Sequence, residues 1–175
     1  MATRKAVIFC SSQDLDQKYI QAARKIVRAA CLAGYDIVSG GTVKGLMNHV
    51  CDEAAKCGAG VIGVIPRFMK GLEHPSLTSC IWTDTMSQRK ELMREGTSLA
   101  IALPGGIGTL DELAETYCLA KMGIYKGKVA AFNMDGFYEP LKSQLDLFVR
   151  SGMLPENALE LLAFPETFED VEALL

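Results

Sequence analysis

Histidine is scarce in this sequence, which contains only His49 and His74 among 175 residues. The two histidines lie in different segments, and neither belongs to an H-E-x-x-H motif or to another spacing typical of metal ligands. A G-x-S-x-G motif is also missing, which argues against a Ser–His–Asp hydrolase. We therefore expect no metal site.

The sequence also lacks an excess of basic residues and a long apolar run. The formal net charge is −3, whereas nucleic-acid-binding surfaces usually need Lys and Arg clustered on one face. No apolar run approaches the roughly 18 residues of a membrane span, and no basic-then-apolar leader precedes the first apolar segment. We expect no nucleic-acid partner, no membrane partner and a cytoplasmic location. A small anion needs only a helix N-terminus and one or two basic side chains, so it remains possible as a ligand.

Cysteine is present, but without a C-x-x-C pair. Most of the six cysteines lie inside apolar runs, where the side chain behaves as a small hydrophobic group. They are Cys10, Cys31, Cys51, Cys57, Cys80 and Cys118. We interpret them as reduced and structural.

Short apolar runs alternate with longer amphipathic ones along the whole chain, whose length predicts a single domain over residues 1–175. We expect strands at 6–10, 35–38, 60–65, 80–83, 99–103, 129–132 and 161–164, and helices at 16–33, 45–57, 84–95, 109–122, 137–149 and from 166 onward. Strands that are apolar on both faces and alternate with helices indicate a parallel sheet. The predicted class is therefore α/β, a doubly wound Rossmann-like sheet with helices on both faces. Ligands of such sheets bind outside the carboxyl ends of the strands.

A glycine-rich segment, PGGIGT at 104–109, lies between an apolar strand and a helix. Glycines allow close approach of a ligand to the backbone, and the helix N-terminus favours an anion such as phosphate. A Walker A loop would need Gly-Lys-Ser/Thr, and a dinucleotide fingerprint would need glycine at Asp111. The segment thus predicts a phosphate-binding loop that is neither a Walker A loop nor a dinucleotide fingerprint. The structural alternative is a tight turn that binds no ligand.

Thr109 and Glu112 have the spacing of a capping box. In that interpretation Thr109 caps the helix and Glu112 accepts from its backbone N–H. Glu112 could instead serve chemistry beside a bound phosphate, because two carboxylates at that position are repelled by the ligand unless they act on it. Both interpretations of Glu112 stay open at this point.

Two basic residues, Arg89 and Lys90, lie on the helix that precedes the strand leading into the glycine-rich segment. Arg can bind phosphate in a bidentate manner or pair with a carboxylate, and Lys adds a point charge. The alternative is a solvated, charged helix face. Two further strand ends, Ser11 after the first strand and Gly41 after the second, provide weaker candidates for ligand contacts.

With these residues collected, the sequence resembles the Lonely Guy family of cytokinin riboside 5′-monophosphate phosphoribohydrolases, many of which were once labelled lysine decarboxylases. The residues from Pro104 to Glu112 match the family pattern P-G-G-x-G-T-x-x-E, and Met86 with Arg89 and Lys90 matches M-x-x-R-K. The resemblance extends from about Val7 to the C-terminal helix.

The resemblance implies a homodimer that hydrolyses the N-glycosidic bond of a nucleoside 5′-monophosphate, either AMP or a cytokinin riboside 5′-monophosphate, without a cofactor. It maps the catalytic pair onto Arg89 and Glu112. The residues expected to contact the substrate or its phosphate are Lys90, Gly105, Gly106, Ile107, Gly108, Thr109, Ser11, Gly41 and Met86. The sequence departs from the family pattern at Thr42, Asn48, Phe68 and Ser87, which leaves the identity of the base open. A non-catalytic nucleotide carrier or molybdenum-cofactor carrier on the same fold is the alternative function.

Overall fold

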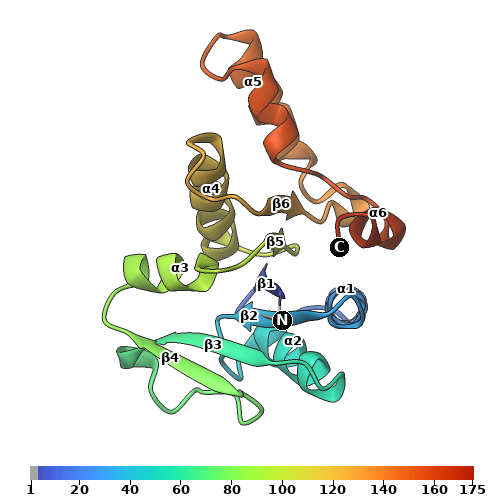
Figure 1. Ribbon diagram of the computed structural model, residues 1–175. Coiled ribbons are helices and arrows are strands. Elements are labelled where there is room, and N and C mark those ends of the chain that lie inside the picture. The colour runs from blue at the N-terminus through green and yellow to red at the C-terminus, as the bar shows by residue number, and fades with distance from the viewer. Residues whose placement is uncertain (1–3) are drawn as a thin grey trace.

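The computed structural model describes residues 4–175, which form one six-stranded sheet in the order β4-β3-β2-β1-β5-β6 (Figure 1). All five strand pairings are parallel. The strands are β1 (Arg4–Phe9), β2 (Tyr35–Ser39), β3 (Val61–Pro66), β4 (Ser79–Thr83), β5 (Leu99–Ala102) and β6 (Lys128–Ala131). The predicted α/β class with a parallel sheet is confirmed.

Helices cover both faces of the sheet, with α1, α2 and α6 on one side and α3, α4 and α5 on the other (Figure 1). Their bounds are α1 (Gln17–Leu32), α2 (Gly45–Lys56), α3 (Met86–Arg94), α4 (Ile107–Lys121), α5 (Glu139–Arg150) and α6 (Phe168–Glu172), with short 3-10 helices at η1 (Arg67–Met69), η2 (Met134–Gly136) and η3 (Glu156–Leu161). In β1, Ile8 packs in the core below α1 and α2, whereas Val7 and Phe9 pack in the core below α4. Because both faces of each central strand are buried, the strands are apolar without alternation.

The seventh strand predicted at 161–164 is wrong. Residues 156–161 form the 3-10 helix η3, and only Ala163 makes an isolated bridge, to Ala130 of β6. The helix ends at Leu161 and Pro165 follows four residues later, so too few extended residues remain for a strand. The apolar pattern there reflects packing of Leu162 into the core.

The strand order reverses between β1 and β5, which pair directly although they lie about ninety residues apart in sequence. In parallel α/β sheets, ligands bind in the crevice outside the carboxyl ends of strands at such a switch point. Within residues 4–175, no helix combines the length and apolar character needed to cross a membrane.

Candidate active site

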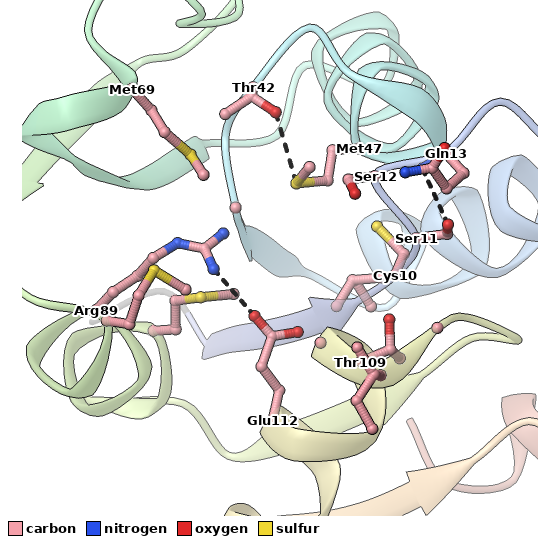
Figure 2. A pocket seen from close by; sticks show the side chains of 17 residues that line it. Cys10, Ser11, Ser12, Gln13, Thr42, Met47, Met69, Arg89, Thr109 and Glu112 are labelled. Atoms are coloured by element: carbon pink, nitrogen blue, oxygen red, sulfur yellow. Dashed lines mark hydrogen bonds and ion pairs between the residues drawn. The ribbon is translucent and has the colours of Figure 1, made fainter.

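A cavity of about 410 Å³ opens at the carboxyl ends of β1 and β5, where the switch point predicts a ligand site. Its wall comes from β1 and the loop after it, the turn after β2, α2, η1, α3 and the first two turns of α4 (Figure 2). The residues that line it are Ile8, Cys10, Ser11, Ser12, Gln13, Gly40, Thr42, Met47, Met69, Met86, Arg89, Met93, Gly106, Ile107, Gly108, Thr109 and Glu112. Both members of the predicted catalytic pair are among them.

Arg89 is held at the cavity wall by three different parts of the protein. Its Nε donates to the backbone oxygen of Val64 near the end of β3 over 2.9 Å, and its Nη1 donates to Glu112 Oε1 over 3.2 Å. A side chain at Gly40 would overlap Arg89 Nη2, so glycine is required for the guanidinium to occupy this position. The guanidinium is therefore oriented before any ligand binds.

Glu112 projects from the second turn of α4 toward Arg89, and Figure 2 shows the ends of the two side chains meeting at the cavity wall. The pKa of Glu112 is raised to about 7, chiefly by burial and to a smaller extent by Asp111, while Arg89 and Lys90 act in the opposite direction. Desolvation therefore outweighs the neighbouring guanidinium. A carboxyl group with a pKa near neutrality can exchange a proton during a reaction.

The capping-box interpretation of Thr109 and Glu112 is wrong. Helix α4 begins at Ile107, its N-cap is Gly106, and no side chain caps it. The extended backbone of Gly106 lets the chain enter the helix two residues before Thr109, so Thr109 is already the third helical residue. Glu112 then lies too deep in the helix to reach the cap, and it pairs with Arg89 instead.

The first turn of α4 faces the cavity through Gly106, Ile107, Gly108 and Thr109. The first N–H groups of a helix have no partner within the helix and favour a negative charge. A Cβ at Gly106 or Gly108 would meet no protein atom within 4 Å, so open space adjoins this backbone. This geometry suits an anion at the helix N-terminus.

Ser11 and Met86 also line the cavity, as expected, although Ser11 Oγ already accepts from the backbone N–H of Gln13 over 3.0 Å. Three other predicted contact residues do not line it. Lys90 Nζ pairs with Asp111 and Glu115 on α4. A side chain at Gly105 would overlap Thr109, and one at Gly41 would overlap the backbone of Gly63 in β3. These two glycines permit close packing behind the cavity.

Sequence reasoning missed the apolar part of the wall. Four methionines lie there, Met47 on α2, Met69 on η1, and Met86 and Met93 on α3. Methionine is flexible and polarisable, and it is suited to apolar ligands of irregular shape. Met86 was predicted as a contact residue from the M-x-x-R-K match. The other three were not predicted, because Met47, Met69 and Met93 come from three separate elements.

Comparison with known proteins identifies the family. The sequence model described as "possible lysine decarboxylase" matches residues 47–175. The cytokinin riboside 5′-monophosphate phosphoribohydrolase LOG4 of Arabidopsis thaliana is 35% identical over 167 residues, which cover 94% of this chain and 78% of that protein. The phosphoribohydrolase LOG of Oryza sativa subsp. japonica is 33% identical over 171 residues, covering 96% and 71%. The chain belongs to the Lonely Guy (LOG) family.

Solved structures similar to this LOG-family chain include carriers as well. The molybdenum cofactor carrier protein of Chlamydomonas reinhardtii superposes with a TM-score of 0.73 at 18% identity, covering 98% of this chain and 95% of that one. The molybdenum cofactor binding protein of Rippkaea orientalis gives 0.73 at 20% identity, covering 99% and 96%. At these identities the likeness concerns the fold alone.

Proposed function

We propose that this LOG-family protein hydrolyses the N-glycosidic bond of a nucleoside 5′-monophosphate to a free base and ribose 5-phosphate. The observation that carries the proposal is the buried pair of Arg89 and Glu112, which faces the N-terminus of α4 in one cavity. LOG relatives at 33–35% identity are named for this reaction on cytokinin riboside 5′-monophosphates.

The phosphate binds at the first turn of α4 in this proposal. Ile107, Gly108 and Thr109 line the cavity, and as the first three residues of α4 they have N–H groups without a partner in the helix. The helix dipole adds roughly half a positive charge at this end. Holding the phosphate there fixes the ribose against Glu112, so binding energy remote from the bond positions the reacting carbon.

Glu112 acts on the ribose and the attacking water. Cleavage of a glycosidic bond passes through an oxocarbenium-like state, which a nearby carboxylate stabilises. The bond between the base nitrogen and C1′ breaks with its electron pair going to the base. The oxygen of a water molecule bonds to C1′, and one proton of that water passes to Glu112. The departing base then takes up one proton and Glu112 releases its own, so that water has supplied a hydroxyl to C1′ and a proton to the base. Arg89 anchors the substrate and stabilises the departing base as negative charge develops on it.

A cytokinin riboside 5′-monophosphate is our preferred substrate, with AMP as the simpler member of the same class. Met47, Met69, Met86 and Met93 give the cavity an apolar wall that an apolar substituent on the base could contact. AMP lacks that substituent and would leave part of this wall uncovered.

The second candidate function is non-catalytic carriage of a nucleotide or of molybdenum cofactor, favoured by the shared fold of the carrier structures. A carrier needs the anion site at α4, but it has no use for a buried carboxyl group whose pKa lies near neutrality beside Arg89. The two functions are distinguished by turnover, because a carrier binds its ligand without breaking a bond.

We also propose that the protein forms a homodimer. An apolar groove of about 260 Å³ lies between α4 and α5, and Leu110, Leu147 and Phe148 on these helices are at least 36% exposed. Large exposed apolar patches are unusual on monomers. Light scattering at micromolar concentration should give twice the chain mass of 19.0 kDa, and Phe148→Asp should give the chain mass itself. A wild-type protein that scatters as a monomer would contradict the proposal.

The reaction is tested by incubating the purified protein with AMP and with N6-isopentenyl-AMP and separating the products by chromatography. Free base and ribose 5-phosphate should appear in equal amounts, faster from the isopentenyl compound, and Glu112→Ala should release neither. If no 5′-monophosphate yields free base while the nucleotides still bind, the carrier function replaces the hydrolase.

A further inference from the structure

A second hollow, of about 590 Å³, lies on the outer side of α1 and shares no residue with the cavity at the switch point. Helix α1 lies on the sheet face that also carries α2 and α6 (Figure 1). We call it the α1 hollow, and it is lined by Lys18, Gln21, Ala22, Arg24, Lys25, Arg28, Glu53, Lys56, Met134 and Phe168. Five of these residues are basic and one is acidic, although the whole chain has a net charge of −3.

Among residues 4–175, two of the five cations have a carboxylate partner. Arg28 Nε donates to Glu53 Oε1 over 2.8 Å, and Lys18 Nζ lies 2.8 Å from Asp135 Oδ2. Within the described part of the chain, no carboxylate lies within ion-pair distance of the remaining three cations. They are Arg24, Lys25 and Lys56.

Arg24 is the most unusual of these cations. Its Nη2 contacts His49 Nδ1 at 3.2 Å, and its Nε is buried without a hydrogen-bond partner among residues 4–175. Burial and the neighbouring Arg24 both lower the pKa of His49, so this histidine is neutral at pH 7. A neutral imidazole does not balance the charge of Arg24. A buried guanidinium nitrogen without an acceptor is costly, which an anionic ligand at this position would relieve.

The spacing of the cations along α1 adds electrostatic repulsion between like charges. Arg24 and Arg28 are four residues apart, and Lys25 and Arg28 are three apart, so these like charges face each other on one side of the helix. The protein neutralises comparable cations elsewhere, since Lys90 and Arg94 on α3 both pair with Glu115 on α4. The α1 hollow therefore keeps a positive charge that its own residues do not balance.

We propose that the α1 hollow binds an anion carrying several phosphate groups, such as inorganic tripolyphosphate or the oligophosphate of a nucleoside triphosphate. A single phosphate offers one point of charge, whereas Arg24, Lys25 and Lys56 come from two helices and surround a hollow of hundreds of Å³. Lys25 Nζ lies 3.9 Å from the ring centroid of Phe168, and this cation–π contact orients Lys25 beside another residue that lines the hollow. The volume fits a compact oligophosphate.

The test uses ¹⁵N-labelled protein titrated with inorganic tripolyphosphate, with binding followed by amide chemical shifts. Shifts should change over residues 17–32 and 49–56, whatever happens at the α4 loop. The variant Arg24→Gln/Lys25→Gln/Lys56→Gln should bind at least roughly tenfold more weakly, because hydrogen bonds from charged groups each contribute to that extent. Inorganic phosphate alone should bind more weakly than tripolyphosphate.

The matched control is Lys126→Gln/Lys142→Gln/Arg150→Gln, which removes the same charge outside the α1 hollow. It should bind tripolyphosphate as the wild type does. Shifts confined to residues 104–112, or equal weakening in both triple variants, would overturn the proposal. Base release from a nucleoside monophosphate is measured separately, so failure here leaves the hydrolase proposal untouched.

Discussion

The guanidinium of Arg89 donates to Glu112 over 3.2 Å, and less than a tenth of either residue is exposed. Even so, burial keeps the pKa of Glu112 at about 7. Burial therefore makes ionisation of this carboxyl group unfavourable. Such an arrangement lowers the stability of the protein and is typical of residues that take part in chemistry.

Replacing Glu112 by Gln should stabilise the protein at pH 8. The native state keeps the proton up to about pH 7, whereas the unfolded chain releases it near the ordinary value of 4.5. The native state therefore binds more protons between these values, and the free energy of unfolding falls as pH rises through this window. Glu112→Gln imitates the protonated form, so it should gain about 1 to 3 kcal/mol at pH 8 and little at pH 4.

Urea unfolding at both pH values measures this effect, with activity assayed in parallel. The variant should be more stable at pH 8 and inactive. An equal fall in unfolding free energy from pH 4 to pH 8 in both proteins would contradict the raised pKa.

If ionised Glu112 takes the proton from water, kcat/KM should rise with pH through a limb near 7. Asp111 raises and Lys90 lowers the pKa of this carboxyl group. Asp111→Asn should therefore move the limb to lower pH and Lys90→Gln should move it to higher pH. Steady-state rates from pH 5 to pH 9 check the prediction, and limbs that move together, or not at all, would exclude Glu112 as the titrating group.

Two adjacent glycines should respond differently to alanine. In Gly105→Ala the new methyl group overlaps Thr109, so we expect a loss of about 1 to 3 kcal/mol in unfolding free energy. In Gly106→Ala the new methyl group has free space around it, and Gly106 itself lines the cavity. This variant should fold normally and raise KM for the nucleotide. Denaturation and kinetics on both variants separate packing from ligand contact, and unchanged KM in Gly106→Ala would count against phosphate binding at this turn.

Gly40→Ala tests whether the fixed orientation of Arg89 matters. The added methyl group overlaps Arg89 Nη2 and Met47 Sδ, so the guanidinium must leave its position between Val64 and Glu112. We expect kcat to fall by roughly a hundredfold, as for a small misplacement of a catalytic group. Urea unfolding of Gly40→Ala, measured in parallel, separates a loss of positioning from a loss of stability. Equal kcat values in Gly40→Ala and the wild type would show that Arg89 needs no such positioning.

The fold could be predicted from the sequence because both faces of each central strand are buried. Val7 and Ile8 are adjacent, yet they enter opposite cores, so a continuous apolar run is the expected pattern of a parallel strand. The same reasoning failed at 161–164, where apolar residues enter the core from a 3-10 helix and a single bridge. Apolar runs of four residues do not distinguish these cases.

The site could be predicted in part. The strand order brings Arg89 and Glu112 together, as their places on neighbouring helices suggested, and their catalytic roles remain predictions. Lys90 follows Arg89 directly, and neighbouring residues on a helix point about 100° apart. Arg89 faces the cavity, whereas Lys90 pairs with Asp111 and Glu115 on α4. Local sequence patterns could not predict that Met47, Met69 and Met93 line one cavity, because tertiary packing alone brings these residues together.

The reversal of strand order between β1 and β5 also has a consequence for cooperativity. The cavity takes residues 8–69 and the α3 residues Met86, Arg89 and Met93 from the β1 side of that boundary, because α3 packs on β3 and β4, and it takes residues 106–112 from the β5 side. A molecule bound there touches both halves of the sheet and acts as a bridge between them. Neither half can recognise the substrate by itself. A chain in which β5 has not yet paired with β1 would therefore be inactive, and ligand binding would require that the two halves have come together.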